Sequence, residues 1–215
     1  KGETRIDLLK KNRAILRAIL DGVRPVNTEA ILLLVSNPVD ILTYITLELS
    51  GFAPARVIGS GTVLDTARLK FLVGRMLQVD SRNVHTFIIG EHGDSELPVW
   101  SSANVSGIDL CGFCKISGIP DYQRKLDCMF EEVRTSADKI IENKGATYYA
   151  IAEAVLRIVD SIVRDQDSIL PVSTLVDGHY GLSDICLGVP SVIGAGGVKK
   201  VLDIPLSQSE YADLH

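Results

Sequence analysis

Residues 30–38, Ala-Ile-Leu-Leu-Leu-Val-Ser-Asn-Pro, decide the fold class that the sequence predicts. The first six form a continuous apolar run of strand length, which is typical of a parallel strand buried on both faces. Ser36 or Asn37 can cap a helix and Pro38 suits a first helical turn, so we expect a helix from there to about Leu49. Strand, polar turn and helix in this order are part of a βαβ pattern.

The segments around this stretch extend the pattern. Apolar residues recur at helical spacing from Arg5 to about Leu20, and Val57-Ile58-Gly59 predicts a second short strand that leads to a helix over 64–77. Val84 to Gly90 is predicted to be a further strand. Because ligands bind at the carboxyl ends of strands in α/β sheets, residues that directly follow these strands are candidates for a site.

The second half of the chain has a different character. We expect Asp121 to Asn143 to form one long amphipathic helix, and Thr147 to Arg164 to form a helix apolar on most sides and therefore buried between layers. Strand-like segments follow at 169–176, 184–193 and 198–202. A last helix is expected to begin near Leu206. The chain is thus predicted to be α/β at the front and α+β behind, with the change near Ser60.

The composition limits the classes of function. The chain has 215 residues, of which 46% are hydrophobic and 23% charged, enough to bury a full core. Its net charge of −5, with both signs interspersed, argues against nucleic acid or an anionic membrane as the main partner. The sequence has no apolar run long enough for a membrane helix and no signal-peptide core at its start, so we expect a cytoplasmic protein.

The four cysteines do not predict a metal site. Cys111 and Cys114 form a CxxC, but a zinc ribbon needs a second pair of ligands at matching spacing, and Cys128 has none beside it. The βαβ context of a redox pair is also missing. We therefore expect free thiols and no bound metal.

The candidate for acid–base chemistry is His92, within residues 88–95, Ile-Ile-Gly-Glu-His-Gly-Asp-Ser. An apolar strand that ends at a glycine places this histidine on a tight turn, and histidine can give or take a proton near neutral pH. A surface-turn histidine without function is the alternative. Asp65 and Arg68, three residues apart, share a helix face and could be no more than an exposed ion pair.

A dinucleotide fingerprint is not present in this chain. Such a site needs a Gly-rich turn between strand and helix, followed by an acid about twenty residues later. Gly59-Ser-Gly61 and Gly194-Ala-Gly196 each supply only the first half of that spacing, so the chain by itself predicts no pyrophosphate site.

Five motifs, in order along the chain, resemble the L-lactate/malate dehydrogenase family. They are Gly-Glu-Thr-Arg at 2–5, Val-Ser-Asn-Pro-Val-Asp at 35–40, Ile-Gly-Ser-Gly at 58–61, Leu-Asp-Thr-Ala-Arg at 64–68 and Gly-Glu-His-Gly-Asp at 90–94. Residues 144–151 resemble the lactate branch in particular. The resemblance implies a partial Rossmann-type parallel-sheet domain, the remainder of a dinucleotide-binding domain, over 1–59. An α+β substrate (catalytic) domain would follow over 60–215.

The resemblance also implies roles for four residues in reducing a 2-oxo acid. His92 would donate the proton to the carbonyl oxygen, or accept it in the reverse direction. Asp65 would bond the other ring nitrogen and favour the imidazolium. Arg68 would hold the substrate carboxylate at two points, and Arg5 would stabilise the developing oxyanion once a loop closes. Arg5 could instead be a solvated arginine in a first helical turn.

Further residues are implied at the cofactor and substrate. Asn37 would orient substrate or the nicotinamide edge, Ser60 would help to place the carboxamide, and Val35 would contribute to the cofactor site. Ile151 would pack on the nicotinamide ring, and Thr147 would line the pocket at the substrate's side chain. Asn37 could instead serve only as a helix cap, and Thr147 and Ile151, at i and i+4, could simply pack a helix.

The implied function is an oxidoreductase that interconverts L-lactate and pyruvate with NAD, as a homotetramer in the cytoplasm. Malate dehydrogenase is the close alternative, because the loop that separates the two is not in this sequence. A non-catalytic fragment with a role only in assembly is the alternative from another class. Fructose 1,6-bisphosphate is a possible effector: His85 matches the histidine that binds it in the family, while Lys70 stands where an arginine is expected.

Overall fold

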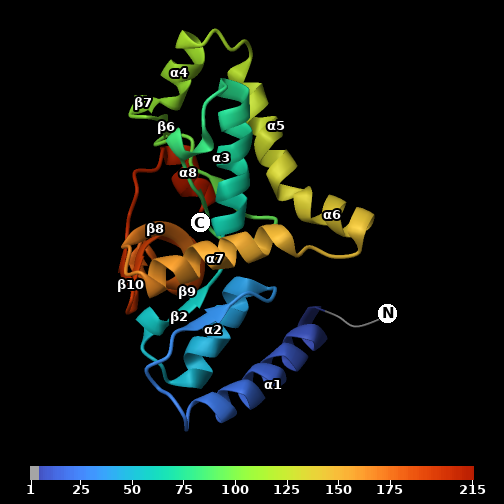
Figure 1. The fold of residues 1–215 in the computed structure, drawn as a ribbon, viewed down its shortest axis with the longest axis vertical. Coiled ribbons are helices and arrows are strands. Elements are labelled where there is room, and N and C mark those ends of the chain that lie inside the picture. Colours follow the sequence, from blue (N-terminus) through green and yellow to red (C-terminus); the bar gives the residue numbers. More distant parts are fainter. Residues whose placement is uncertain (1–4) are drawn as a thin grey trace.

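The computed structural model describes the backbone of residues 5–215 and the side chains of residues 9–215. The first elements are α1 (Arg5–Val23), β1 (Leu32–Leu34), α2 (Val39–Ser50) and β2 (Val57–Gly59). The strands β1 and β2 pair in parallel, and α1 and α2 lie side by side in the lower part of Figure 1. The predicted strand–helix–strand unit is therefore present.

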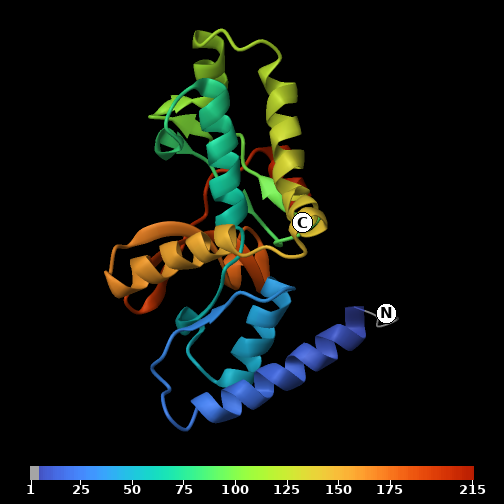
Figure 2. The ribbon, with the colours of Figure 1, turned by 45° about the vertical axis from the view of Figure 1, so that its right-hand side comes forward.

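The second part is built on α3 (Val63–Leu77), which packs against α5 (Tyr122–Arg134) in the upper part of Figure 1 and Figure 2. Five two-residue strands and three helices follow: β3 (Val84–His85), β4 (Ile88–Ile89), β5 (Leu97–Pro98), β6 (Asn104–Val105), β7 (Ile108–Asp109), α4 (Leu110–Ile116), α5 (Tyr122–Arg134) and α6 (Ser136–Lys144). The chain ends with α7 (Tyr149–Val163), β8 (Ser168–His179), β9 (Leu182–Gly194), β10 (Gly197–Val201) and α8 (Gln208–Asp213).

The main sheet has the order β1-β2-β8-β9-β10, so it combines two strands from the first part of the chain with three strands from the last part. β8, β9 and β10 are antiparallel to one another, and β2 meets β8 where Gly59 lies opposite Ser173. A Cβ on Gly59 would come within 2.8 Å of the Ser173 Cβ, so this approach requires glycine. One sheet thus crosses the expected boundary between residues 59 and 60, and the division into two domains stays a prediction.

Two of the four hydrophobic clusters among the described residues fix the position of α3. The first surrounds α3 and includes Leu69, Val73, Ile88 and Leu126, which are all at most 1% exposed. The second lies between the main sheet and α7. Because α3 contributes Val63 to the second cluster as well, its first turn is held rigidly at the junction of the two. Asp65 and Arg68 lie on this turn and the next.

Two predicted elements were wrong in extent, and one helix was missed. The strand expected over 84–90 is split, because β3 pairs with β6 whereas β4 pairs with β5. The helix expected over 121–143 breaks at Thr135, where the hydroxyl groups of Thr135 and Ser136 bond the carbonyl oxygens of Glu131 and Val133. The short helix α4, which carries the CxxC, was not predicted.

Two predictions of burial were also wrong. β1 is only partly buried; among the residues that the structure describes, β2 is the one strand that pairs with it. The helix α7 packs on α3 and β9 with one side only, so Leu156 and Val163 are 58% and 77% exposed. All four cysteines are unpaired. None of the described helices is both long and apolar enough to cross a membrane.

Candidate active site

His92 lies on the loop between β4 and β5, and two contacts fix this loop. At its start, Gly90 and Gly188 exchange two backbone hydrogen bonds of 2.9 Å, with Gly90 in the left-handed region at φ 93°. At the histidine itself, the backbone N–H donates to Oδ2 of Asp40 at 2.8 Å. Asp40 belongs to the first turn of α2, so the N-terminal part of the chain helps to hold the histidine in place.

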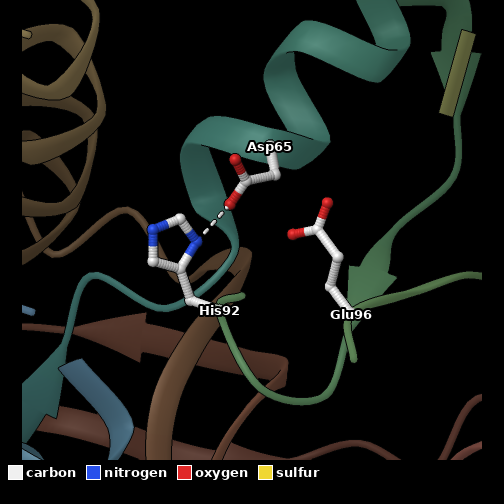
Figure 3. Close-up of side chains that lie close together, drawn as sticks. All are labelled: Asp65, His92 and Glu96. Atoms are coloured by element: carbon white, nitrogen blue, oxygen red, sulfur yellow. Dashed lines mark hydrogen bonds and ion pairs between the residues drawn. The ribbon is translucent and has the colours of Figure 1, made fainter. Parts of the chain in front are cut away.

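The imidazole of His92 meets Asp65 from α3 (Figure 3). Nδ1 lies 2.7 Å from Oδ2 of Asp65, and the other carboxylate oxygen lies 3.6 Å from Nη1 of Arg68. Asp65 is 3% exposed and the side chain of Arg68 is 18% exposed. The structure therefore brings the three predicted residues together, and the aspartate–arginine pair is not a solvated surface pair.

The surroundings favour the protonated form of His92. The hydrogen bond to Asp65 raises the pKa of this imidazole, burial opposes the rise, and the charges of Asp65, Glu96 and Asp40 add to it. Nε2 makes no hydrogen bond to any described residue. A bond at Nδ1 with the opposite nitrogen left open is the arrangement that a proton donor or acceptor needs.

Two buried carboxyl groups beside His92 were not identified from the sequence. Asp40 is 6% exposed; burial raises its pKa, while the neighbouring Ser173 hydroxyl and the His92 N–H oppose the rise. Glu96, on the loop directly before β5, is 7% exposed. The sequence carried no local signal for Glu96, which stands directly before the apolar residues 97–99, where a buried acid and a solvated turn have the same pattern.

Asp65, His92 and Glu96 offer one ligand atom each within 4.8 Å of one another, a spacing that could be considered for a metal ion. His92 and Asp65, however, bond directly to each other at 2.7 Å, which leaves no space for an ion between these two atoms. The cluster therefore fits acid–base chemistry better than metal binding, and the absence of a metal stays a prediction.

The predicted cofactor residues lie at the carboxyl ends of the parallel strands. Val35 and Asn37 follow β1 and are exposed, whereas Ser60 follows β2, is 5% exposed and donates its N–H to Leu34 O at 2.8 Å. Asn37 does not cap α2, because the N-cap position is Pro38 and no side chain caps it. Val35 and Asn37 thus lie where ligands bind in α/β sheets, and their role at a cofactor stays a prediction.

The helix expected to begin at Thr147 begins later, so Thr147 and Ile151 do not share a helix face. Thr147 is half-buried in the segment between α6 and α7, and α7 begins only at Tyr149. Ile151 is half-buried on α7 and packs against the cluster between the sheet and α7. Arg5 is the first residue of α1, and its side chain lies outside the described residues.

His85 and Lys70 occupy different surroundings. His85 is exposed on β3, opposite Asn104. Lys70 is half-buried on α3, where burial and the nearby Arg157 lower its pKa. Lys70 lines a cavity of about 230 Å³ together with Arg82 and Arg157, and His85 is not part of its lining.

The larger cavities do not coincide with the histidine. Cavities of about 630 and 590 Å³ flank its loop, lined in part by Glu96 and by Asp40 respectively, yet neither is lined by His92 or Arg68. The side-chain geometry of His92, Asp65 and Arg68 therefore indicates this site, whereas the cavity volumes indicate the regions on either side of it.

The comparisons with known proteins agree with this geometry. Residues 62–215 match the lactate/malate dehydrogenase α/β C-terminal domain, and residues 1–59 match the lactate/malate dehydrogenase NAD binding domain. The L-lactate dehydrogenase of Acetivibrio thermocellus is 50% identical over 98% of this chain and 66% of its own length. L-lactate dehydrogenase 1 of Clostridium acetobutylicum is 49% identical over 99% and 68%.

Solved structures lead to the same family. The minor L-lactate dehydrogenase from Enterococcus mundtii, in its ligand-bound form, superimposes with a TM-score of 0.94 at 40% identity, over 100% of this chain and 68% of that one. MGS-M5, a lactate dehydrogenase from a Medee basin deep-sea metagenome library, gives 0.93 at 40% identity, over 99% and 68%. The chain spans about two thirds of the length of the curated relatives it matches.

These matches confirm the predicted α/β fold, with part of an NAD-binding domain followed by an α/β C-terminal domain. With its two parts matched to the two domain models of one family, and with half of its residues identical to those of a curated relative, the chain belongs to the lactate/malate dehydrogenase family.

Proposed function

We propose that this protein interconverts L-lactate and pyruvate, with NAD as the hydride carrier and His92 as the proton donor and acceptor. The observation that carries the proposal is the 2.7 Å bond between His92 Nδ1 and Asp65, with Arg68 directly beside it. The relatives named L-lactate dehydrogenase support it, since they are about half identical to this chain.

The side chains divide the work as follows. The imidazolium of His92 gives the Nε2 proton to the carbonyl oxygen of pyruvate, and neutral His92 takes it back from lactate. Asp65 keeps the proton on the correct nitrogen and stabilises the imidazolium. The planar guanidinium of Arg68 suits a two-point contact with the substrate carboxylate. Arg5 is proposed to stabilise the developing negative charge on oxygen.

The cofactor supplies the hydride when it is bound. Val35, Asn37 and Ser60 at the strand ends would hold its nicotinamide end, and Ile151 would shield one face of the ring so that the other faces the substrate. Thr147 is proposed to border the methyl group of pyruvate, where its small side chain leaves room.

The substrate class is tested by NADH oxidation with pyruvate and with oxaloacetate, compared as kcat/KM. Lactate dehydrogenase activity requires a clear preference for pyruvate, because a malate enzyme must pair a second carboxylate with an additional cation. The reverse preference would assign malate instead. If the protein did not bind NADH in a direct titration and turned over neither acid, a role in assembly would replace both.

A homotetramer and an effect of fructose 1,6-bisphosphate are further parts of the proposal. Lys70 retains the positive charge of the expected arginine but lacks its planar fork, so we expect weak or altered activation. Pyruvate saturation curves with and without the sugar bisphosphate test this, and superimposable curves would reject activation. Analytical ultracentrifugation tests the tetramer.

A further inference from the structure

Glu96 is a buried acid that the proposed mechanism leaves unused. It is 7% exposed, and its Oε1 is shielded from solvent and has no hydrogen-bond partner among the described residues. In Figure 3 its carboxyl group points from the loop that leads into β5 toward Asp65 and the imidazole of His92. One oxygen of Glu96, one of Asp65 and one ring nitrogen of His92 lie within 4.8 Å of one another.

The charges around Glu96 are already engaged elsewhere. His92 bonds Asp65 at 2.7 Å, and Arg68 lies 3.6 Å from the same carboxylate. Arg134, at the end of α5, pairs with Glu131 at 2.8 Å. Two buried carboxylates near one imidazolium repel each other unless one of them holds a proton. Since Asp65 has the cationic partners, Glu96 is the group that remains a neutral acid.

We propose that Glu96 is a positioning residue for the acid–base pair. As a neutral acid it leaves Asp65 and His92 as a single ion pair, and as a carboxylate it extends the pH range over which His92 keeps its proton. The claim about protons concerns the chain alone; only its consequence for turnover rests on the proposed lactate dehydrogenase activity.

The electrostatics of the cluster agree with this assignment. Burial raises the pKa of Glu96 to about 8, the charge of Asp65 adds to the rise, and the charges of His92, Arg134 and Arg68 oppose it. In the other direction, the charge of Glu96 contributes to raising the pKa of His92. The two groups therefore titrate as a coupled pair, and removing one must change the titration of the other.

Carbon-13 NMR of the full chain over a range of pH tests the proposal in two ways. In the unmutated chain, the Glu96 carboxyl carbon should titrate near pH 8, well above an ordinary glutamate. In the variant Glu96→Gln, the His92 imidazole should lose its proton at a pH lower by on the order of one unit, because the amide cannot acquire the stabilising charge. Glu132→Gln, an exposed acid on α5, is the matched control and should leave His92 unchanged.

A titration of Glu96 near pH 4, or a His92 midpoint that Glu96→Gln does not move, would overturn the proposal. The measurement on the unmutated chain decides the question even where a variant does not fold. For the active enzyme, the fall of kcat/KM for pyruvate at alkaline pH should begin at a lower pH in Glu96→Gln, with little change in kcat/KM at more acidic pH. Glu96→Asp should restore the original pH profile in part. A merely structural role would lower activity at every pH. Shifted NMR midpoints without any pyruvate turnover would refute the proposed function and leave this inference intact.

Discussion

Replacement of Asp65 by asparagine isolates the interaction on which the site depends. The change keeps the shape of the side chain but removes the negative charge that lies 2.7 Å from Nδ1 of His92. Asp65 is 3% exposed, so solvent screens this interaction little. A hydrogen bond to a charged group contributes roughly 1.5–3 kcal/mol and one pKa unit equals about 1.36 kcal/mol, so the pKa of His92 should fall by about one to two units.

The sign of the effect on stability follows from the same shift. The pKa of His92 is raised in the folded protein, so the pair stabilises the fold fully below the unfolded value of 6.5, and this stabilisation is lost as the pH rises through the raised folded value. The free energy of unfolding of Asp65→Asn should therefore differ most from that of the unmutated chain on the acid side of this window.

Two assays check this prediction, namely an NMR titration of the His92 imidazole and urea unfolding at several pH values. Asp80→Asn is the matched control, since it also removes an aspartate from an ion pair, the exposed one with Arg82 at 2.7 Å. It should change neither the His92 titration nor the pH dependence of stability between about pH 6 and 8, because the pKa of Asp80 is lowered to about 2 and this carboxylate is fully charged in that range. An unchanged midpoint of the His92 titration in Asp65→Asn would refute the reasoning, because the carboxylate would then not stabilise the protonated imidazole.

Three further predictions concern Arg68, Asp40 and Glu210. Arg68→Lys should raise KM for pyruvate by on the order of tenfold or more, with a smaller effect on kcat, because an ammonium cannot reproduce a two-point contact; steady-state kinetics with unchanged KM would exclude that contact. Asp40→Ala should destabilise the chain by about 1–3 kcal/mol in urea unfolding, because the His92 N–H loses its acceptor at 2.8 Å; an unchanged midpoint would show that this bond is dispensable. Burial raises the pKa of Glu210, but the hydrogen bonds that its carboxylate accepts from Ser101 and from nearby backbone N–H groups outweigh burial. The pKa of Glu210 therefore lies below the ordinary value. Stability from Glu210 should therefore be present above about pH 4.5 and be lost as the pH falls through its folded pKa. Glu210→Gln should lack that acid-side loss in thermal unfolding, and an equal loss in both proteins would assign it to other groups.

The sequence predicted the residues whose position depends on local rules. His92 follows a strand that ends at a glycine, and Asp65 and Arg68 share a helix face because they are three residues apart. Local sequence patterns were therefore enough to predict that each lies near the end of a strand or the start of a helix. Which element ends meet in space came from the family resemblance, because one chain gives no direct signal for contacts between distant segments.

The residues that the sequence missed depend on packing between distant segments. Glu96 is buried because the start of β5 and the first turn of α3 come together, and a local pattern of Ser-Glu-Leu cannot distinguish this from a solvated turn. Asp40 was quoted only as part of a motif, although its carboxylate accepts the His92 N–H. Thr147 was expected at the start of a helix that in the structure begins two residues later, at Tyr149.

The central claim is that His92 transfers the proton during reduction of pyruvate. The most direct test is kcat/KM for pyruvate of His92→Gln in the active enzyme, measured together with the Kd for NADH by fluorescence titration. The account predicts a loss of kcat/KM on the order of 10²–10⁴-fold or more with the Kd for NADH unchanged, because glutamine cannot donate the proton. A variant that retained turnover within about tenfold of the unmutated enzyme would contradict it, since general acid catalysis contributes more than that.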